Sequence, residues 1–165
     1  MPEIETALPS DGHSILEITA KVGIFNPTEL SCVDELWCAY QDSGEASGYV
    51  FLVYRQDGGT AQGYACFGPH PLTQGTYDLY WIAVDPALQE RGVGQALLSR
   101  AEAEVRARGG RLMLIETSAT EDYAPARRLY AACDFRLEAT IHDFYAPGDH
   151  LLIFAKEVDD GTLEA

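Results

Sequence analysis

The stretch Leu88–Leu98, LQERGVGQALL, decides how this sequence is interpreted. It places Gly92 and Gly94 between a run typical of a buried strand, 77–84, and a run with helical periodicity, 93–108. Glycine lets the backbone come close to a ligand, and the free N–H groups at the start of a helix favour negative charge. The stretch therefore predicts a phosphate site, and a plain tight turn before a helix is the alternative.

Two nucleotide-binding fingerprints can be tested against this spacing. The dinucleotide fingerprint G-x-G-x-x-G directly follows its strand and precedes an acidic residue about 20 positions on. Glu116 ends a strand at about that distance, but Leu97 replaces the third glycine, and DPALQER separates Val84 from Gly92. A P-loop fails as well, because no G-K-[ST] follows. Both nucleotide readings are therefore disfavoured.

Length and composition predict one soluble domain. A chain of 165 residues matches the usual size of a single domain, so we expect one domain over 1–165 with loose acidic tails at about 1–12 and 159–165. No apolar run is long enough to span a membrane, and no basic and then apolar N-terminus indicates a signal peptide. We therefore expect a cytoplasmic protein with no membrane partner.

Net charge and the spacing of Cys and His residues limit the classes of partner and metal site that we expect. The net charge of −15 argues against nucleic acid, whose binding depends on clusters of Lys and Arg. It favours a cationic substrate, or it only keeps the protein soluble. No C-x-x-C or H-x-x-x-H pair occurs, so we expect no metal site. We also expect buried free thiols at Cys32, Cys38, Cys66 and Cys133.

The rest of the chain alternates between strand and helix patterns. Hydrophobic periodicity and turn residues predict helices at 27–40, 93–108 and 123–133, and strands at 13–21, 49–55, 61–67, 77–84, 111–117, 135–143 and 150–158. D-G-G predicts a hairpin between the second and third strands. Asp122 is a plausible helix cap, and FYAPGD, from Phe144, is expected to be a loop. This order predicts an α/β sandwich with mixed strand pairing.

Two motifs resemble those of the GNAT family of N-acetyltransferases. WIAVDPALQERGVGQALL, at 81–98, resembles the acetyl-CoA-binding motif Q/R-x-x-G-x-G/A, which starts here at Gln89. APARRLYAACDF, at 124–135, resembles the family's helix with a Leu-Tyr pair. The resemblance covers about 49–158 and implies a single-domain fold with a central, mixed, mostly antiparallel sheet of about seven strands flanked by helices. Asp134 departs from the pattern, because a glycine is usual there.

The resemblance implies transfer of an acetyl group from acetyl-CoA to a primary amine, by direct attack in a ternary complex. The amine would belong to a small molecule, a protein lysine or a protein N-terminus. The alternative is a non-catalytic acyl-CoA-binding sensor or scaffold. The implied cofactor-binding positions are Ile82, Ala83, Val84, Gln89, Glu90, Arg91, Gly92, Val93, Gly94, Gln95 and Tyr130.

The resemblance also implies catalytic roles. Tyr130, of the Leu-Tyr pair, would donate a proton to the leaving thiolate; otherwise it is a core tyrosine. Asp78 is the only carboxylate in its apolar strand, and it stands where some histone acetyltransferases of the family carry a glutamate base. Burial disfavours a charged carboxylate, which suits a base, although Asp78 would instead be structural if it is paired internally. Glu116 is the competing base, or a polar strand end.

Two tyrosines are predicted to contact the acceptor. Tyr80 shares a strand face with Asp78, and Tyr145 lies in the FYAPGD segment, although an exposed aromatic residue there is as often simple packing. The sequence leaves open the acceptor's identity, the length of the acyl chain and the oligomeric state, and it allows a homodimer.

Overall fold

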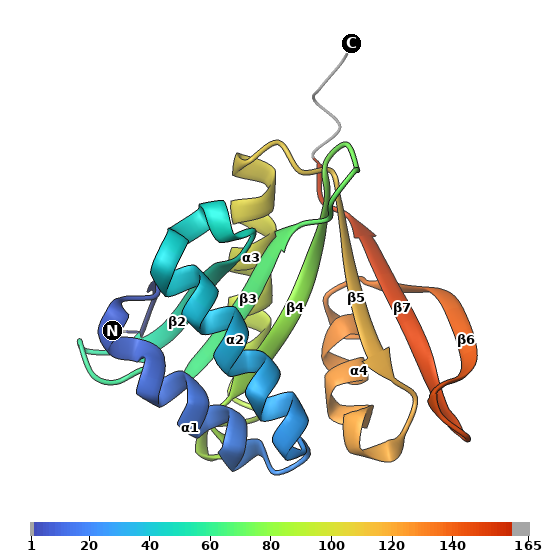
Figure 1. The fold of residues 1–165 in the computed structure, drawn as a ribbon, viewed down its shortest axis with the longest axis horizontal. Coiled ribbons are helices and arrows are strands. Elements are labelled where there is room, and N and C mark those ends of the chain that lie inside the picture. Colours follow the sequence, from blue (N-terminus) through green and yellow to red (C-terminus); the bar gives the residue numbers. More distant parts are fainter. Residues whose placement is uncertain (1, 160–165) are drawn as a thin grey trace. The chain divides into compact units, whose positions relative to one another are not determined.

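The computed structural model describes residues 2–159, which form four α-helices and seven β-strands (Figure 1). The helices are α1 Gly12–Val22, α2 Pro27–Ser43, α3 Val93–Ala107 and α4 Ala124–Ala132. The strands are β1 Pro2–Thr6, β2 Val50–Gln56, β3 Gly63–Pro69, β4 Thr76–Val84, β5 Leu112–Ser118, β6 Arg136–Ala146 and β7 Asp149–Glu157.

The strands form one mixed sheet in the order β1-β2-β3-β4-β5-β7-β6. The β4–β5 pair is parallel, whereas β1–β2, β2–β3, β5–β7 and β6–β7 are antiparallel. The expected mixed, mostly antiparallel sheet of seven strands with flanking helices is confirmed.

The chain divides into two compact units. The first comprises Met1–Gly68 and Tyr80–Ala101, and the second comprises Pro69–Leu79 and Glu102–Ala165. The boundaries fall inside β3, β4 and α3, so each of these elements contributes residues to both units.

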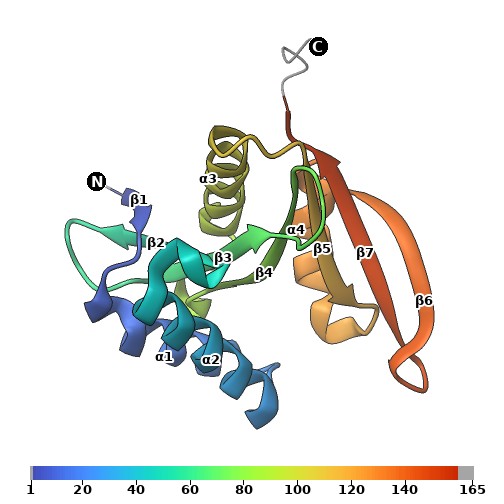
Figure 2. The same ribbon diagram turned by 45° about the horizontal axis from the view of Figure 1, so that its top comes forward.

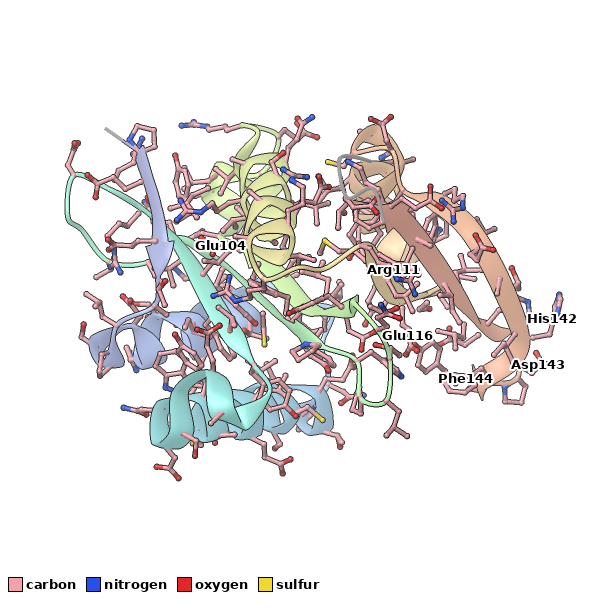
Figure 3. The ribbon with its side chains drawn as sticks, turned by 90° about the horizontal axis from the view of Figure 1, so that it is seen from above. Glu104, Arg111, Glu116, His142, Asp143 and Phe144 are labelled. Atoms are coloured by element: carbon pink, nitrogen blue, oxygen red, sulfur yellow. The ribbon has the colours of Figure 1, made fainter. Side chains whose placement is uncertain are left out.

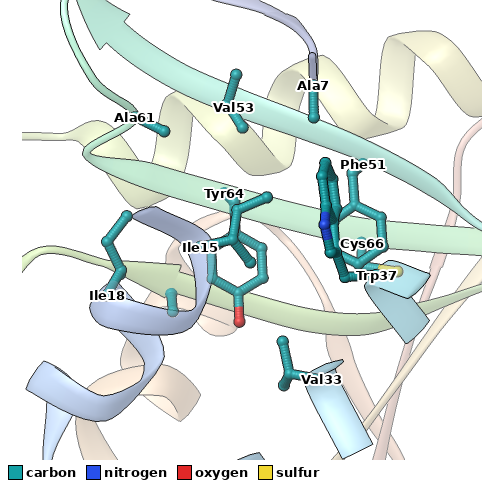
Figure 4. Packing of buried hydrophobic residues seen from close by; sticks show 11 residues of the cluster. Ala7, Ile15, Ile18, Val33, Trp37, Phe51, Val53, Ala61, Tyr64 and Cys66 are labelled. Atoms are coloured by element: carbon teal, nitrogen blue, oxygen red, sulfur yellow. The ribbon is translucent and has the colours of Figure 1, made fainter. Parts of the chain in front are cut away.

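The core of the first unit lies between two helices and the strands β2 and β3 (Figure 4). In Figure 2, α1 and α2 lie on one side of these strands and the start of α3 on the other. Trp37 of α2 packs edge-on against Phe51 of β2, with ring centroids 5.2 Å apart. Burying each large apolar side chain contributes roughly 1.5–3 kcal/mol to stability. This core therefore anchors β2 and β3.

The N-terminal region differs from the sequence-based expectation. The segment 13–21 was predicted as a strand, but it belongs to α1. Its buried residues Ile15, Ile18 and Thr19 stand at positions i, i+3 and i+4, which lie on one face of a helix. The β-branched residues favoured a strand, but their spacing fits the helical period. Residues 2–6, expected in a loose tail, form β1 and pair with β2. In the other expected tail, 160–165 lie outside the described residues.

In the second unit, α4 packs against β7 through aromatic rings. The ring of Tyr130 lies 5.9 Å from that of Phe154 and 6.5 Å from that of Phe135. Asp134 follows α4 with φ +67°, a left-handed conformation that usually calls for glycine. The aspartate therefore stands where the backbone angle favours glycine, the residue that the resemblance implies at this position.

Three smaller expectations are also corrected. Asp122 does not cap α4, because Tyr123 is the N-cap and α4 begins one residue later. FYAPGD is mostly strand, since β6 extends to Ala146 and β7 begins at Asp149. Cys32 and Cys38 are exposed on α2, whereas Cys66 and Cys133 are buried as predicted.

Candidate active site

The loop between β4 and α3 is held at its start by Asp85. The backbone N–H of Asp85 donates to the Gln62 carbonyl at 2.8 Å, and the Oδ1 of Asp85 accepts from the Ala87 N–H at 3.0 Å. The latter bond caps a short 3₁₀ turn, Pro86–Leu88. The connection between the strand and α3 is therefore ordered by its own hydrogen bonds.

Gly92 shapes the end of this loop. Its φ is +79°, and nothing lies within 4 Å of the position a Cβ would take, so the backbone angle, and not a lack of space, calls for glycine. The N–H of Ala96 donates to the Gly92 carbonyl at 3.0 Å. The N–H groups of Val93–Gln95 therefore precede the intrahelical bonds and are oriented to receive an anion.

The start of α3 packs closely on β3 at another glycine. A Cβ on Gly63 would lie 3.3 Å from Val93 and 3.2 Å from Leu97. Both side chains are buried, while Gln89, Glu90, Arg91, Gly92 and Gln95 are exposed. The predicted anion-binding loop is therefore open to solvent on a helix that is fixed to the sheet.

The pairing of β4 with β5 is short. It runs from Thr76 opposite Leu112 to Leu79 opposite Ile115, whereas β4 continues to Val84. The positions Ile82–Val84, predicted to contact the ligand through their main chain, therefore lie beyond this register.

Asp78 of β4 has a partner that sequence reasoning missed. His70 Nδ1 lies 2.6 Å from Asp78 Oδ2, and the two side chains are 48% and 15% exposed. Because a carboxylate can only accept a hydrogen bond, the ring nitrogen donates. The only signal was a histidine in the segment GPHP, eight residues before the aspartate, and its relevance depends on how the connecting loop folds. Asp78 is therefore neither fully buried nor unpaired.

The other predicted acid and the acceptor tyrosines are placed as follows. Glu116 is exposed on β5 (Figure 3). It lies two residues after Leu114, the partner of Asp78 in the register, so it shares that face. Tyr80 is half-buried with its ring 5.3 Å from Tyr49. Tyr145 is on β6 and is 48% exposed.

Tyr130 combines a buried ring with an open hydroxyl. Its side chain is 5% exposed, and burial raises the pKa of its phenol, so the group stays protonated. Among residues 2–159, the hydroxyl has no hydrogen-bond partner. Thr117 Oγ1 on β5 is also buried without a partner there, and no sequence pattern indicated this residue.

The chain matches the family model of the acetyltransferase (GNAT) family over residues 16–135. The chain belongs to the GNAT family of acetyltransferases. Its fold resembles a GNAT-family protein from Desulfovibrio desulfuricans with a TM-score of 0.92 and 41% identity, covering 96% of this chain and 99% of that one. The family predicted from the two motifs is therefore confirmed.

Two further solved structures share the GNAT fold. YncA from Salmonella typhimurium, solved with acetyl-CoA, gives a TM-score of 0.75 at 25% identity, covering 98% of this chain and 96% of that one. The ribosomal-protein-S18-alanine N-acetyltransferase of Escherichia coli gives 0.77 at 22% identity, covering 100% and 99%. No curated protein matches the sequence.

Within residues 2–159, no helix is both long enough and apolar enough to cross a membrane. Over that range, no group of three or more His, Cys, Asp or Glu side chains could hold a metal ion.

Proposed function

We propose that this protein transfers the acetyl group of acetyl-CoA to a primary amine by direct attack in a ternary complex. The observation that carries the proposal is the exposed loop ending at Gly92, which leads into the free N–H groups of Val93–Gln95. Such a helix N-terminus suits the pyrophosphate of CoA. The main chain of Ile82–Val84, beyond the β5 register, would pair with the extended pantetheine arm.

Tyr130 is proposed as the proton donor to the leaving thiolate. Burial raises the pKa of its phenol, and a thiol with a pKa near 8.5 is more acidic than a phenol near 10. The phenol is therefore protonated when the thiolate forms, and its hydroxyl has no competing partner among residues 2–159. Its position in the Leu-Tyr pair supports this role.

Asp78 is proposed to receive the proton that the amine must lose. An amine with a pKa near 10 is mostly protonated at neutral pH and cannot attack until a base removes a proton. The side chain of Asp78 is partly exposed and is hydrogen-bonded to His70. Glu116, exposed on the same face, is the competing base.

The acceptor is proposed to be a cationic amine in the cytoplasm. The net charge of −15 attracts cations, and the half-buried Tyr80 and exposed Tyr145 offer aromatic surface for an ammonium group. A small polyamine, a lysine side chain and a protein N-terminus all meet this description.

A thermal melt with acetyl-CoA, CoA and NAD tests ligand binding. A ligand at about 100 times its dissociation constant adds about 2.7 kcal/mol to stability, which raises the melting temperature by roughly 5–10 °C for a chain of this size. We expect this shift with acetyl-CoA and CoA, and none with NAD. No shift with either CoA form would contradict the proposal.

Gly92→Asp provides a variant with a matched control. The new carboxylate would repel the pyrophosphate, so the shift with CoA should be lost. Gly109 has the same φ of +79° and equally open space around it, so Gly109→Asp introduces the same strain and charge outside the predicted loop. A shift retained in Gly92→Asp, or lost in both variants, would count against the assigned site.

A further inference from the structure

His70 is held in place by its own backbone. It lies between Pro69 and Pro71, and a residue before proline is restricted to extended conformations. Its N–H donates to the Thr76 carbonyl at 2.8 Å, and its carbonyl accepts from Thr73 Oγ1 at 2.8 Å. These restraints fix the backbone of His70, and therefore the position from which its exposed side chain extends.

The ring of His70 joins Asp78 to solvent. Its Nδ1 donates to the carboxylate at 2.6 Å, which leaves Nε2 as the acceptor nitrogen of the neutral ring. Within the described range, Nε2 has no hydrogen-bond partner. The side chain of His70 is 48% exposed, about three times the exposed fraction of Asp78, at 15%. The imidazole therefore forms a bridge from a largely covered carboxylate to water.

We propose that His70 completes the base: its Nε2 takes up the amine's proton, Asp78 accepts the Nδ1–H and stabilises the imidazolium, and Nε2 then releases the proton to water, so that the Asp78–His70 pair and not the carboxylate alone acts as the base. This inference rests on the proposed acetyl transfer. The ammonium acceptor begins with three N–H protons, of which the amide product retains one. A second proton balances the thiol proton of CoA: as the N–C bond forms and the C–S bond breaks, Tyr130 donates a proton to the thiolate, and the proton lost by the amine nitrogen replaces it. The remaining proton must reach water, and His70 supplies its route.

Other charged groups near this pair do not offer the same route. Arg111 Nε donates to the Gln74 carbonyl at 2.7 Å, so this cation is held by the loop backbone. Glu116 shares the face of Asp78 through the β4–β5 register. Arg111 and Glu116 are both labelled in Figure 3, and within residues 2–159 neither is hydrogen-bonded to His70. The proton route therefore depends on the imidazole.

The test is acetyl transfer by His70→Ala, followed as CoA thiol release with a panel of spermidine, lysine and an N-terminal alanine peptide. We expect kcat to fall at least tenfold while the KM for acetyl-CoA stays unchanged. Added imidazole should restore the rate of His70→Ala and leave that of Asp78→Asn unchanged. Rescue by a free base separates proton transfer from a structural role.

His13→Ala is the matched control, because His13 is an exposed histidine 3.6 Å from Glu17 in the first unit, and its kcat should stay at the wild-type value. Wild-type kcat in His70→Ala, or a loss that imidazole does not restore, would overturn the role of His70 alone. If the wild-type protein acetylates none of the three amines, the proposed transfer falls and this inference falls with it.

Discussion

Two buried tyrosines, one in each unit, differ in what their hydroxyls contact. In the first unit, the Tyr64 hydroxyl lies 2.6 Å from Thr19 Oγ1. In the second, the Tyr130 hydroxyl has no partner among residues 2–159. Burial raises the pKa of both phenols. Since buried polar groups are normally hydrogen-bonded, the difference assigns Tyr64 to the fold and supports the role proposed for Tyr130.

Two carboxylates repeat this contrast. Both oxygens of Asp11 accept hydrogen bonds from Arg55, at 2.9 and 2.7 Å, and the two side chains are 4% and 8% exposed. Among the described residues, Asp78 has one hydrogen-bonding partner, the partly exposed His70. The Asp11–Arg55 pair is buried, so it can stabilise the fold but cannot exchange a proton with solvent. The Asp78–His70 pair is partly exposed, so it can exchange one.

Arg55→Met should produce the largest change in stability. It leaves the Asp11 carboxylate buried without its partner, which lowers the free energy of unfolding by about 3–5 kcal/mol. His70→Met, which removes the partner of a more accessible carboxylate, should lower it by no more than about 1 kcal/mol. Urea unfolding of both variants measures the difference. Equal losses would show that the two pairs play the same structural part.

Tyr130→Phe should lower kcat by roughly 10²-fold, the lower range for a general acid, because it removes the proton donor and no internal hydrogen bond. Tyr64→Phe should leave kcat unchanged and lower stability by about 1–2 kcal/mol, through its bond to Thr19. Steady-state kinetics and urea unfolding of the two variants measure whether Tyr130→Phe lowers kcat and Tyr64→Phe lowers stability. A fall in kcat of the same size in Tyr64→Phe would erase the distinction.

Acid should weaken the Asp11–Arg55 pair, with a smaller effect. Burial raises the pKa of Asp11, but hydrogen bonds from Arg55 and the Leu8 N–H outweigh it and hold the pKa below its usual value. The stability from this group is therefore complete above about pH 4 and is lost as pH falls through the folded-state pKa. Urea unfolding below pH 4 should show a steeper decline for the wild type than for Asp11→Asn. Parallel curves would contradict this.

Local patterns predicted much of the fold and the turn at Gly92 that ends the candidate anion-binding loop. The Gly92 turn, α3 and the β2–β3 hairpin depend on neighbouring residues, so periodicity and turn chemistry were sufficient. The segment 13–21 was misassigned because its β-branched residues favour strands. Residues 2–6 gave no strand signal because their pairing partner, β2, lies about fifty positions away.

The proposed base was only half predictable from the sequence. Asp78 stood out as the only carboxylate in its strand, but its pairing with His70 depends on a loop that closes through the His70 N–H and the Thr76 carbonyl. The open hydroxyl of Tyr130 could not be read from the sequence either, because the residue type is the same as that of the satisfied Tyr64. What is missing from a sequence is which polar groups remain without partners.

The most direct test of the account is CoA thiol release by the wild-type protein, with acetyl-CoA and a cationic amine supplied separately and together. We expect release only when both are present, with the acetylated amine formed in equal amount. No release with any amine, from protein that acetyl-CoA stabilises in a melt, would contradict it and would favour a non-catalytic acyl-CoA-binding module.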